Sequence, residues 1–193
     1  ATTEIYTLSL HDALPIFGRL FEKKGVEMII DAFIEKAAVD TSYKLLIAGT
    51  GEVEYETYLK NKVSQRKLDE RIHFLGYRKD VFKLMSKAKA LIVASDFEGF
   101  GFITAEAMYA GCYVIGKNTA GTRLQFDNLN KKIGYEIGSR FMEKDALSCI
   151  IESIMAEKID VKKSLSVVQT AVGELYGIRK SASNVFEFYN KIR

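Results

Sequence analysis

The stretch that decides how this chain folds is Ser95-Asp96-Phe97-Glu98-Gly99-Phe100-Gly101-Phe102-Ile103-Thr104-Ala105-Glu106-Ala107-Met108. An apolar run at residues 90–94 precedes it. A short, bounded and partly β-branched run of this kind is typical of a buried strand in a parallel sheet. The stretch then passes two glycines and is predicted to enter a helix near Phe102 or Ile103. Open α/β sheets bind their ligands at such a strand-to-helix loop.

The same stretch carries groups suited to a phosphorylated ligand. The free N–H groups and the positive dipole end of the predicted helix favour an anion such as phosphate. Gly99 and Gly101 allow positive φ and a close approach of the backbone to a ligand. Glu98 lies before the helix and Glu106 about one turn into it, so the two carboxylates can address different parts of one extended ligand.

Strands and helices alternate along the rest of the chain. Strands are predicted at residues 14–18, 43–48, 71–75, 90–94, 113–116 and 133–137. Helices are predicted at residues 26–38, 52–67, 80–88, 102–111, 144–156, 161–171 and 179–192, with a loop at 117–122. This alternation favours an α/β fold with a doubly wound, Rossmann-like parallel sheet.

The first sixteen residues, ATTEIYTLSLHDALPI, resemble the translation of a common sequencing-library adapter. We therefore expect residues 1–16 to be a non-native segment, residues 17–193 to form the domain, and the natural protein to continue upstream. Without this segment 23 acidic and 28 basic side chains remain, a net charge of +5. Pro15 falls inside the predicted first strand, where a proline removes a ladder hydrogen bond, so we expect this strand to be the weakest of the sheet.

Composition limits the classes of function. The 193 residues are 48% hydrophobic and 27% charged, which favours one α/β domain with a sizeable core. No apolar run is long enough to span a membrane. The mild positive charge is scattered, which argues against a nucleic-acid partner. His73 is the only histidine outside residues 1–16, so a histidine triad or a zinc hydrolase site within this chain is not expected, and no metal site is predicted.

A second motif, Gly18-Arg19-Leu20-Phe21-Glu22-Lys23-Lys24-Gly25, follows the predicted first strand. It places Arg19 and Lys24 five residues apart in a loop close to the switch point of a doubly wound sheet. A guanidinium fork and a compact ammonium charge suit a diphosphate whose negative charge grows during a reaction.

Together, EGFGFITAE followed by AM, and GRLFEKKG, resemble the signature of the retaining GT-B glycosyltransferases of family 4, or group 1. The resemblance covers residues 17–193 and implies one half of a GT-B fold, the C-terminal domain that binds the nucleotide diphosphate sugar. It implies a hexosyltransferase type of enzyme that transfers a glycosyl group to an acceptor hydroxyl with retention of configuration. Because cations and a helix dipole neutralise the leaving diphosphate in this class, no metal or other cofactor is implied.

The resemblance also assigns roles to residues. Arg19 and Lys24, with Gly18, would hold the donor diphosphate, and Glu98 would contact the transferred sugar or its cationic transition state. Glu106 would bind the ribose hydroxyls. The backbone amides that would meet the diphosphate belong to Gly99, Phe100, Gly101, Phe102 and Ile103, and the loops at Gly49 and Tyr77 would contact the nucleotide. The rings of Phe97, Phe100 and Phe102 are expected to pack against the protein rather than to stack on the ligand. Leu124 stands where the family often has an acid.

The implied partners are a nucleotide sugar, an acceptor saccharide or glycolipid, and the missing N-terminal acceptor domain of the same protein. A role in polysaccharide biosynthesis follows, in the cytoplasm or at the inner face of the membrane, and the isolated fragment is expected to be inactive.

Three alternatives stay open at this point: a GT-B-like sugar-nucleotide epimerase, a nucleotide-binding oxidoreductase and a non-catalytic nucleotide-binding or interaction module. The oxidoreductase is disfavoured because Glu54 occupies the third glycine position of the fingerprint that begins at Gly49.

Overall fold

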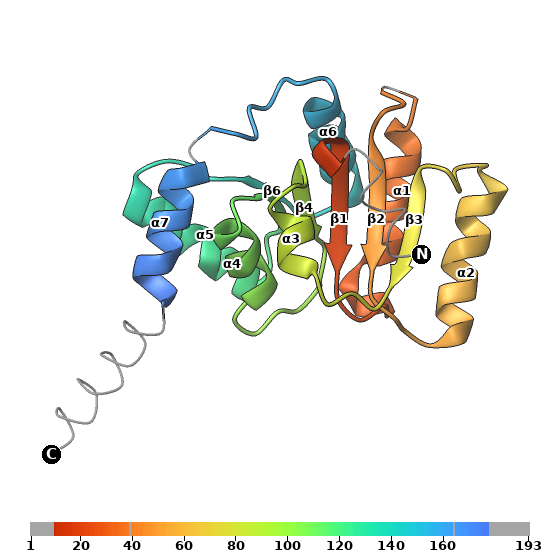
Figure 1. Ribbon diagram of the computed structural model, residues 1–193, viewed down its shortest axis with the longest axis horizontal. Coiled ribbons are helices and arrows are strands. Elements are labelled where there is room, and N and C mark those ends of the chain that lie inside the picture. Colours follow the sequence, from red (N-terminus) through yellow and green to blue (C-terminus); the bar gives the residue numbers. More distant parts are fainter. Residues whose placement is uncertain (1–9, 39, 164, 178–193) are drawn as a thin grey trace, which may run out of the picture.

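The computed structural model describes residues 10–38, 40–163 and 165–177. Its six strands are parallel and form two ladders, β1-β2-β3 and β4-β5-β6. Because β1 lies beside β4, the order across the molecule is 3-2-1-4-5-6, which confirms the doubly wound fold and puts the switch point between β1 and β4 (Figure 1). The strands are Ala13–Phe17 (β1), Lys44–Ala48 (β2), Ile72–Gly76 (β3), Ala90–Val93 (β4), Tyr113–Lys117 (β5) and Ser139–Phe141 (β6).

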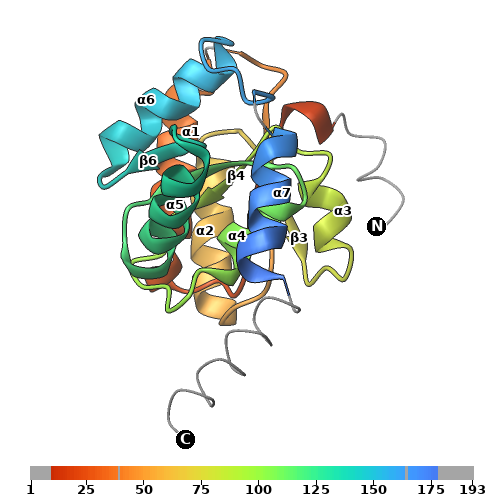
Figure 2. The same cartoon turned by 90° about the vertical axis from the view of Figure 1, so that its left-hand side faces the viewer.

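Helices cover both faces of this sheet, as the view in Figure 2 shows for α6 and α3. Helices α1, α2 and α6 share one hydrophobic cluster with the strands, and α4, α5 and α7 share another. The helices are Val26–Lys36 (α1), Val53–Gln65 (α2), Val81–Met85 (α3), Phe102–Tyr109 (α4), Ala120–Ile133 (α5), Lys144–Met155 (α6) and Leu165–Tyr176 (α7), with the 3₁₀ turns Leu10–Asp12 (η2) and Glu22–Lys24 (η3).

Strand β4 shows why the central strands read as continuous apolar runs. Ala90 and Ile92 belong to the cluster under α1, α2 and α6, whereas Leu91 and Val93 belong to the cluster under α4, α5 and α7. All four side chains are buried. A strand covered on both faces needs apolar residues at every position, not at alternate ones.

The proline of β1 explains why the two ladders are not joined. The Gly18 amide donates to Ala48 of β2 at 3.1 Å, and the Ala13 carbonyl accepts from Lys89 beside β4 at 3.0 Å. Since backbone groups of a parallel strand alternate between its two neighbours, the Pro15 nitrogen faces β4 and has no hydrogen to donate. The predicted loss of a ladder hydrogen bond therefore falls on the β4 side, while the pairing of β1 with β2 extends from Ala13 to Phe17.

Two sequence predictions beyond β5 were wrong. The loop predicted at residues 117–122 is shorter, because helix α5 already begins at Ala120. The strand predicted at 133–137 is absent: Ile133 ends α5, and Gly134 closes it with a left-handed φ of 91°. The last strand is β6 instead. The helix predicted at 161–171 begins later, at Leu165, and the helix predicted at 179–192 lies outside the described residues.

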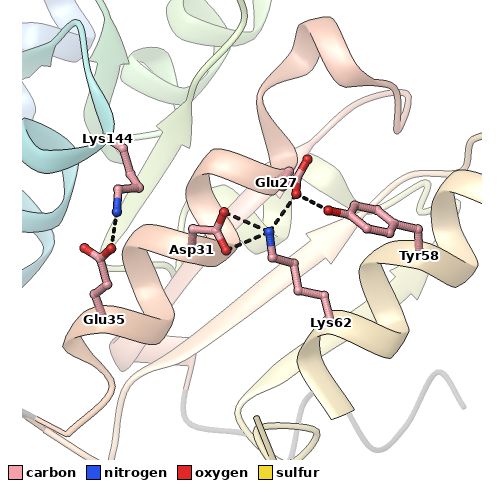
Figure 3. A network of polar contacts seen from close by, with 6 residues as sticks. All are labelled: Glu27, Asp31, Glu35, Tyr58, Lys62 and Lys144. Atoms are coloured by element: carbon pink, nitrogen blue, oxygen red, sulfur yellow. Dashed lines mark hydrogen bonds and ion pairs between the residues drawn. The ribbon is translucent and has the colours of Figure 1, made fainter. Parts of the chain in front are cut away.

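A polar network joins the helices on the α1 face (Figure 3). Lys62 of α2 reaches Glu27 at 2.6 Å and Asp31 at 2.8 Å, both on α1. The Tyr58 hydroxyl donates to the same Glu27 carboxylate. On the other side of α1, Lys144 of α6 pairs with Glu35, so α1 is connected to both neighbouring helices. Hydrogen bonds from Lys62 and Tyr58 hold the pKa of Glu27 below its ordinary value of 4.5.

We predict that Lys62→Met lowers the free energy of unfolding at pH 7 by roughly 1 kcal/mol, the upper end for exposed ion pairs. Because the pKa of Glu27 is lowered in the folded protein, its contribution is present above pH 4.5 and is lost as the pH falls through the folded pKa. Urea unfolding at pH 7 and pH 3 should therefore show a smaller difference between variant and wild type at pH 3.

The control is Lys60→Met on the same helix, whose contact with Glu56 is longer, at 3.4 Å. A cost for Lys60→Met as large as that for Lys62→Met, or a cost of Lys62→Met that does not change with pH, would contradict the assignment of stability to this network.

Candidate functional site

A hollow of about 910 Å³ lies at the carboxyl ends of β1, β2 and β3. Of the residues predicted from the sequence, it is lined by Gly18, Arg19, Gly49, Tyr77, Ile103 and Glu106. A smaller hollow shares Gly18, Arg19 and Ile103 with it and is lined in addition by Lys24 and Glu98. The structure thus brings the two predicted cations and the two predicted carboxylates to adjoining hollows at the switch point.

The loop after β1 is positioned by backbone contact with the loop after β2. The Gly18 amide bonds to Ala48, and the Leu20 amide bonds to Thr50 at 3.0 Å. A Cβ at Gly49 would lie 1.7 Å from the Gly18 carbonyl oxygen. A glycine is therefore required at position 49, where the two backbone segments cross. The same crossing places the exposed Arg19 at the rim of the hollow.

Lys24 and Glu98 form an ion pair across the switch point. Lys24 comes from η3, after β1, and Glu98 from the loop after β4. The side chains are 28% and 15% exposed. Gly25 allows this approach, since it adopts φ 67° and a Cβ there would lie 2.4 Å from the Ala94 carbonyl oxygen. The sequence predicted separate ligand contacts for Lys24 and Glu98, whereas here the two groups contact each other.

The amino end of α4 has no side-chain cap. Ile103 lines both hollows, whereas the other residues predicted to meet the diphosphate, Gly99, Phe100, Gly101 and Phe102, line neither. Gly101 is the N-cap residue, with φ 79°, and no side chain bonds to the first turn. The Gly101 carbonyl accepts from Thr104 and Ala105. Within the described part of the chain, no acceptor is found for the amides of Phe102 and Ile103. These donors and the helix dipole can bind an anionic oxygen.

The start of α5 supports the loop that carries Glu98, a role that was not predicted from the sequence. Thr119 Oγ1 donates to the Ser95 carbonyl at 2.8 Å, the Gly121 amide to the Glu98 carbonyl at 2.7 Å, and Gln125 Nε2 to the Phe100 carbonyl at 2.6 Å. The helical spacing of Phe126, Leu129 and Ile133 was the signal available for finding α5.

The three phenylalanines of the loop differ in how far their rings are exposed. Phe97 is 73% exposed, which does not fit the expected packing role. Phe102 is 69% exposed, but its ring packs against that of Phe100, with 4.7 Å between ring centroids. Phe100 is half-buried and meets the edge of the Tyr176 ring of α7, with 5.3 Å between ring centroids. Gly99 and Phe97 lie on the exposed side of the loop.

The loop after β3 brings Tyr77 to the far wall of the hollow. Its ring is 74% exposed. Its neighbour Arg78 is held by Asp80 in a two-point ion pair, with distances of 2.8 and 2.6 Å. Leu124, where the family often has an acid, is 45% exposed on α5.

Other chemistry is limited in the described residues. No group of three or more His, Cys, Asp or Glu side chains is arranged to hold a metal ion in the part of the chain that the structure describes. Burial lowers the pKa of His73, which favours its neutral form, as expected for a structural residue. None of the helices from residue 10 to residue 177 is long and apolar enough to cross a membrane.

Comparison with known proteins places this geometry in a family. Residues 12–168 match the model of glycosyl transferases group 1. The chain is 32% identical, over 98 residues, to the N-acetylgalactosamine-N,N'-diacetylbacillosaminyl-diphospho-undecaprenol 4-alpha-N-acetylgalactosaminyltransferase of Campylobacter jejuni. That alignment covers 51% of this chain and 26% of the relative.

Two solved structures share the fold. HepE of Anabaena in complex with UDP-glucose has a TM-score of 0.82 at 21% identity, covering 98% of this chain and 51% of HepE. The C-terminal domain of the group 1 glycosyl transferase LpcC from Francisella tularensis has a TM-score of 0.75 at 22% identity and covers 91% of both chains. This chain thus corresponds to one half of a GT-B enzyme, and it belongs to the group 1 glycosyltransferase family.

Proposed function

We propose that this chain is the donor-binding half of a glycosyltransferase that moves a hexosyl group from a nucleotide diphosphate sugar to an acceptor hydroxyl with retention of configuration. The observation that carries the proposal is the meeting, at one switch point, of Arg19, the Lys24–Glu98 pair and the uncapped start of α4. Two cations and a helix dipole at one place favour a diphosphate.

The arrangement suggests how the ligand lies. Arg19 and Glu106 line the larger hollow, in which Tyr77 forms the far wall, so the nucleoside fits there with its ribose near Glu106. Its diphosphate would then lie at the start of α4, and the sugar would extend toward Glu98 at the mouth of the smaller hollow, whose own volume is only about 20 Å³. HepE, which shares the fold, was solved with UDP-glucose, and this supports a nucleotide sugar as the ligand class.

In this assignment each group acts where charge develops. As the bond from the sugar to the diphosphate breaks, the leaving group gains negative charge, which Arg19, Lys24 and the α4 amides would stabilise. Glu98 would stabilise the positive charge that forms on the sugar. Glu98 and Lys24 pair with each other in the free protein. When the nucleotide sugar binds, this pair must therefore separate, so that the Lys24 ammonium faces the diphosphate and the Glu98 carboxylate faces the sugar.

The chain covers only about half of HepE and a quarter of the Campylobacter relative. We propose that an N-terminal domain supplies the acceptor site, and that the acceptor is a saccharide or glycolipid of polysaccharide biosynthesis, handled in the cytoplasm or at the inner membrane face. Residues 1–16 are proposed to be foreign to this protein, and residues 17–193 to be its donor-binding domain.

A nucleotide diphosphate should stabilise the chain against heat. At 100 times its dissociation constant a ligand that binds only the folded state adds about 2.7 kcal/mol to the free energy of unfolding. A thermal-shift panel of UDP, GDP, ADP and their sugars should find at least one such ligand. Arg19→Ala and Glu106→Ala should reduce the shift, because each removes a proposed contact.

Lys23→Ala is the matched control for Arg19→Ala, since Lys23 is an exposed cation in the same loop and lines neither hollow. Equal losses for Arg19→Ala and Lys23→Ala would point to a general charge effect and against the site. The absence of any shift across the panel would favour a non-catalytic interaction module.

The purified chain should bind donor without turning it over. Nucleotide release from the donor that gives the largest thermal shift, measured with and without added saccharide acceptors, should stay at the level of a protein-free blank, because the acceptor domain is absent. Multiple turnovers by the chain alone would show that the proposed division of labour is wrong.

A further inference from the structure

The backbone of residues 95–101 is held from one side at three carbonyl groups. Thr119, Gly121 and Gln125, all at the start of α5, donate to the carbonyls of Ser95, Glu98 and Phe100, as described above. A Cβ on Gly121 would lie 2.5 Å from the Phe100 carbonyl carbon and 2.6 Å from the Gly101 nitrogen. The two backbones therefore touch, and the loop cannot shift toward α5.

Holding a carbonyl also fixes the direction of the next amide. In a planar trans peptide the C=O and the following N–H point in opposite directions. The first of the three peptides shows the effect: the Ser95 carbonyl is bound by Thr119, and the Asp96 amide donates away from α5, to Lys23 in the loop after β1 at 2.9 Å. By the same geometry the amides of Gly99 and Gly101 point away from α5.

Unlike the Asp96 amide, these two amides have no acceptor among the described residues. Gly101 adopts φ 79°, and a glycine can reverse the sign of φ at little cost. The peptide between Phe100 and Gly101 could therefore flip, turning its carbonyl toward the ligand and its N–H away. The hydrogen bond from Gln125 opposes this flip, because it binds the carbonyl only in the present orientation.

We propose that Gln125 is a positioning residue for the donor diphosphate. By binding the Phe100 carbonyl it keeps the Gly101 amide facing the ligand, next to the free amides of Phe102 and Ile103 at the start of α4. This inference rests on the proposed function. Gln125 itself is fully buried behind the loop and is expected to touch no ligand.

The surroundings of Gln125 make a clean substitution available. Its Oε1 atom is buried and has no hydrogen-bond partner in the described structure. Gln125→Met keeps the length of the side chain and removes one hydrogen bond together with this unsatisfied oxygen, so the fold should be retained. Gln169→Met is the matched control, because Gln169 Nε2 donates at 2.9 Å to the Tyr109 carbonyl at the opposite end of α4.

The test compares affinities for UDP and GDP with those for uridine and guanosine, measured by calorimetry on wild type, Gln125→Met and Gln169→Met. Loss of an amide hydrogen bond to a charged phosphate should weaken binding of the nucleotide diphosphate at least about tenfold in Gln125→Met. Affinity for the nucleoside should change less than about twofold, because the nucleoside does not reach the start of α4. Gln169→Met should match wild type for both ligands.

Three other results would contradict the inference, and one of them would also contradict the proposed function. Wild type that binds neither diphosphate overturns the proposed function and this inference with it. Wild type that binds, with equal affinity in Gln125→Met, overturns only the inference. Equal weakening by both variants, or of nucleoside and diphosphate alike, shows a merely structural role for Gln125 and also overturns it.

A second measurement needs no variant and covers the case in which Gln125→Met does not fold. The chemical shift of the wild-type Gly101 amide proton should move downfield on addition of whichever nucleotide diphosphate the protein binds. It should not change on addition of the corresponding nucleoside. An unchanged Gly101 resonance at saturating diphosphate would overturn the inference.

Discussion

The close contact between the Gly101 and Gly121 backbones is the constraint on which the site depends. Neither residue has a side chain, and a Cβ on Gly121 would overlap the Phe100–Gly101 peptide. This contact brings the start of α5 against the loop after β4, within reach of its carbonyls. As a result the loop that carries Glu98 has a fixed backbone although Phe97 and Gly99 are exposed. Rigid support behind an exposed loop is what precise ligand contacts require.

The topology explains why residues distant in the sequence meet. Parallel strands place all their following loops at one edge, and the reversal of strand order between β1 and β4 opens a crevice there. The loop after β1 brings the cations, the loop after β4 brings Glu98, and α4 brings Glu106 and its free amides. Gly25 and Gly49 let these segments cross at distances that any side chain would forbid.

Much of this could be predicted from the sequence, for reasons visible in particular residues. The buried strands are continuous apolar runs, and the GRLFEKKG and EGFGFITAE motifs mark the loops that line the hollows. Prediction from the sequence fails where tertiary contact overrides local pattern. Helix α5 was missed because Ala120 and Gly121 resemble a loop, and the Ile133–Ile137 alternation suggested a strand although Gly134 ends a helix there. The ion pair between Lys24 and Glu98 and the part played by Gln125 depend on contacts over 74 and 25 residues, which no local pattern encodes.

The proline in β1 has a consequence for the molecule as a whole. Because Pro15 offers no hydrogen to β4, β1 and β4 form no continuous ladder in the described structure, and the hydrogen bond from Lys89 to Ala13 lies at the edge opposite the hollows. At the ligand edge, the two half-sheets are joined by the Lys24–Glu98 pair and by the hydrogen bond from the Asp96 amide to the Lys23 carbonyl at 2.9 Å. A nucleotide held by Arg19 on one half and by α4 on the other would act as a cross-link between them, so its binding energy would also serve as mechanical reinforcement of the domain.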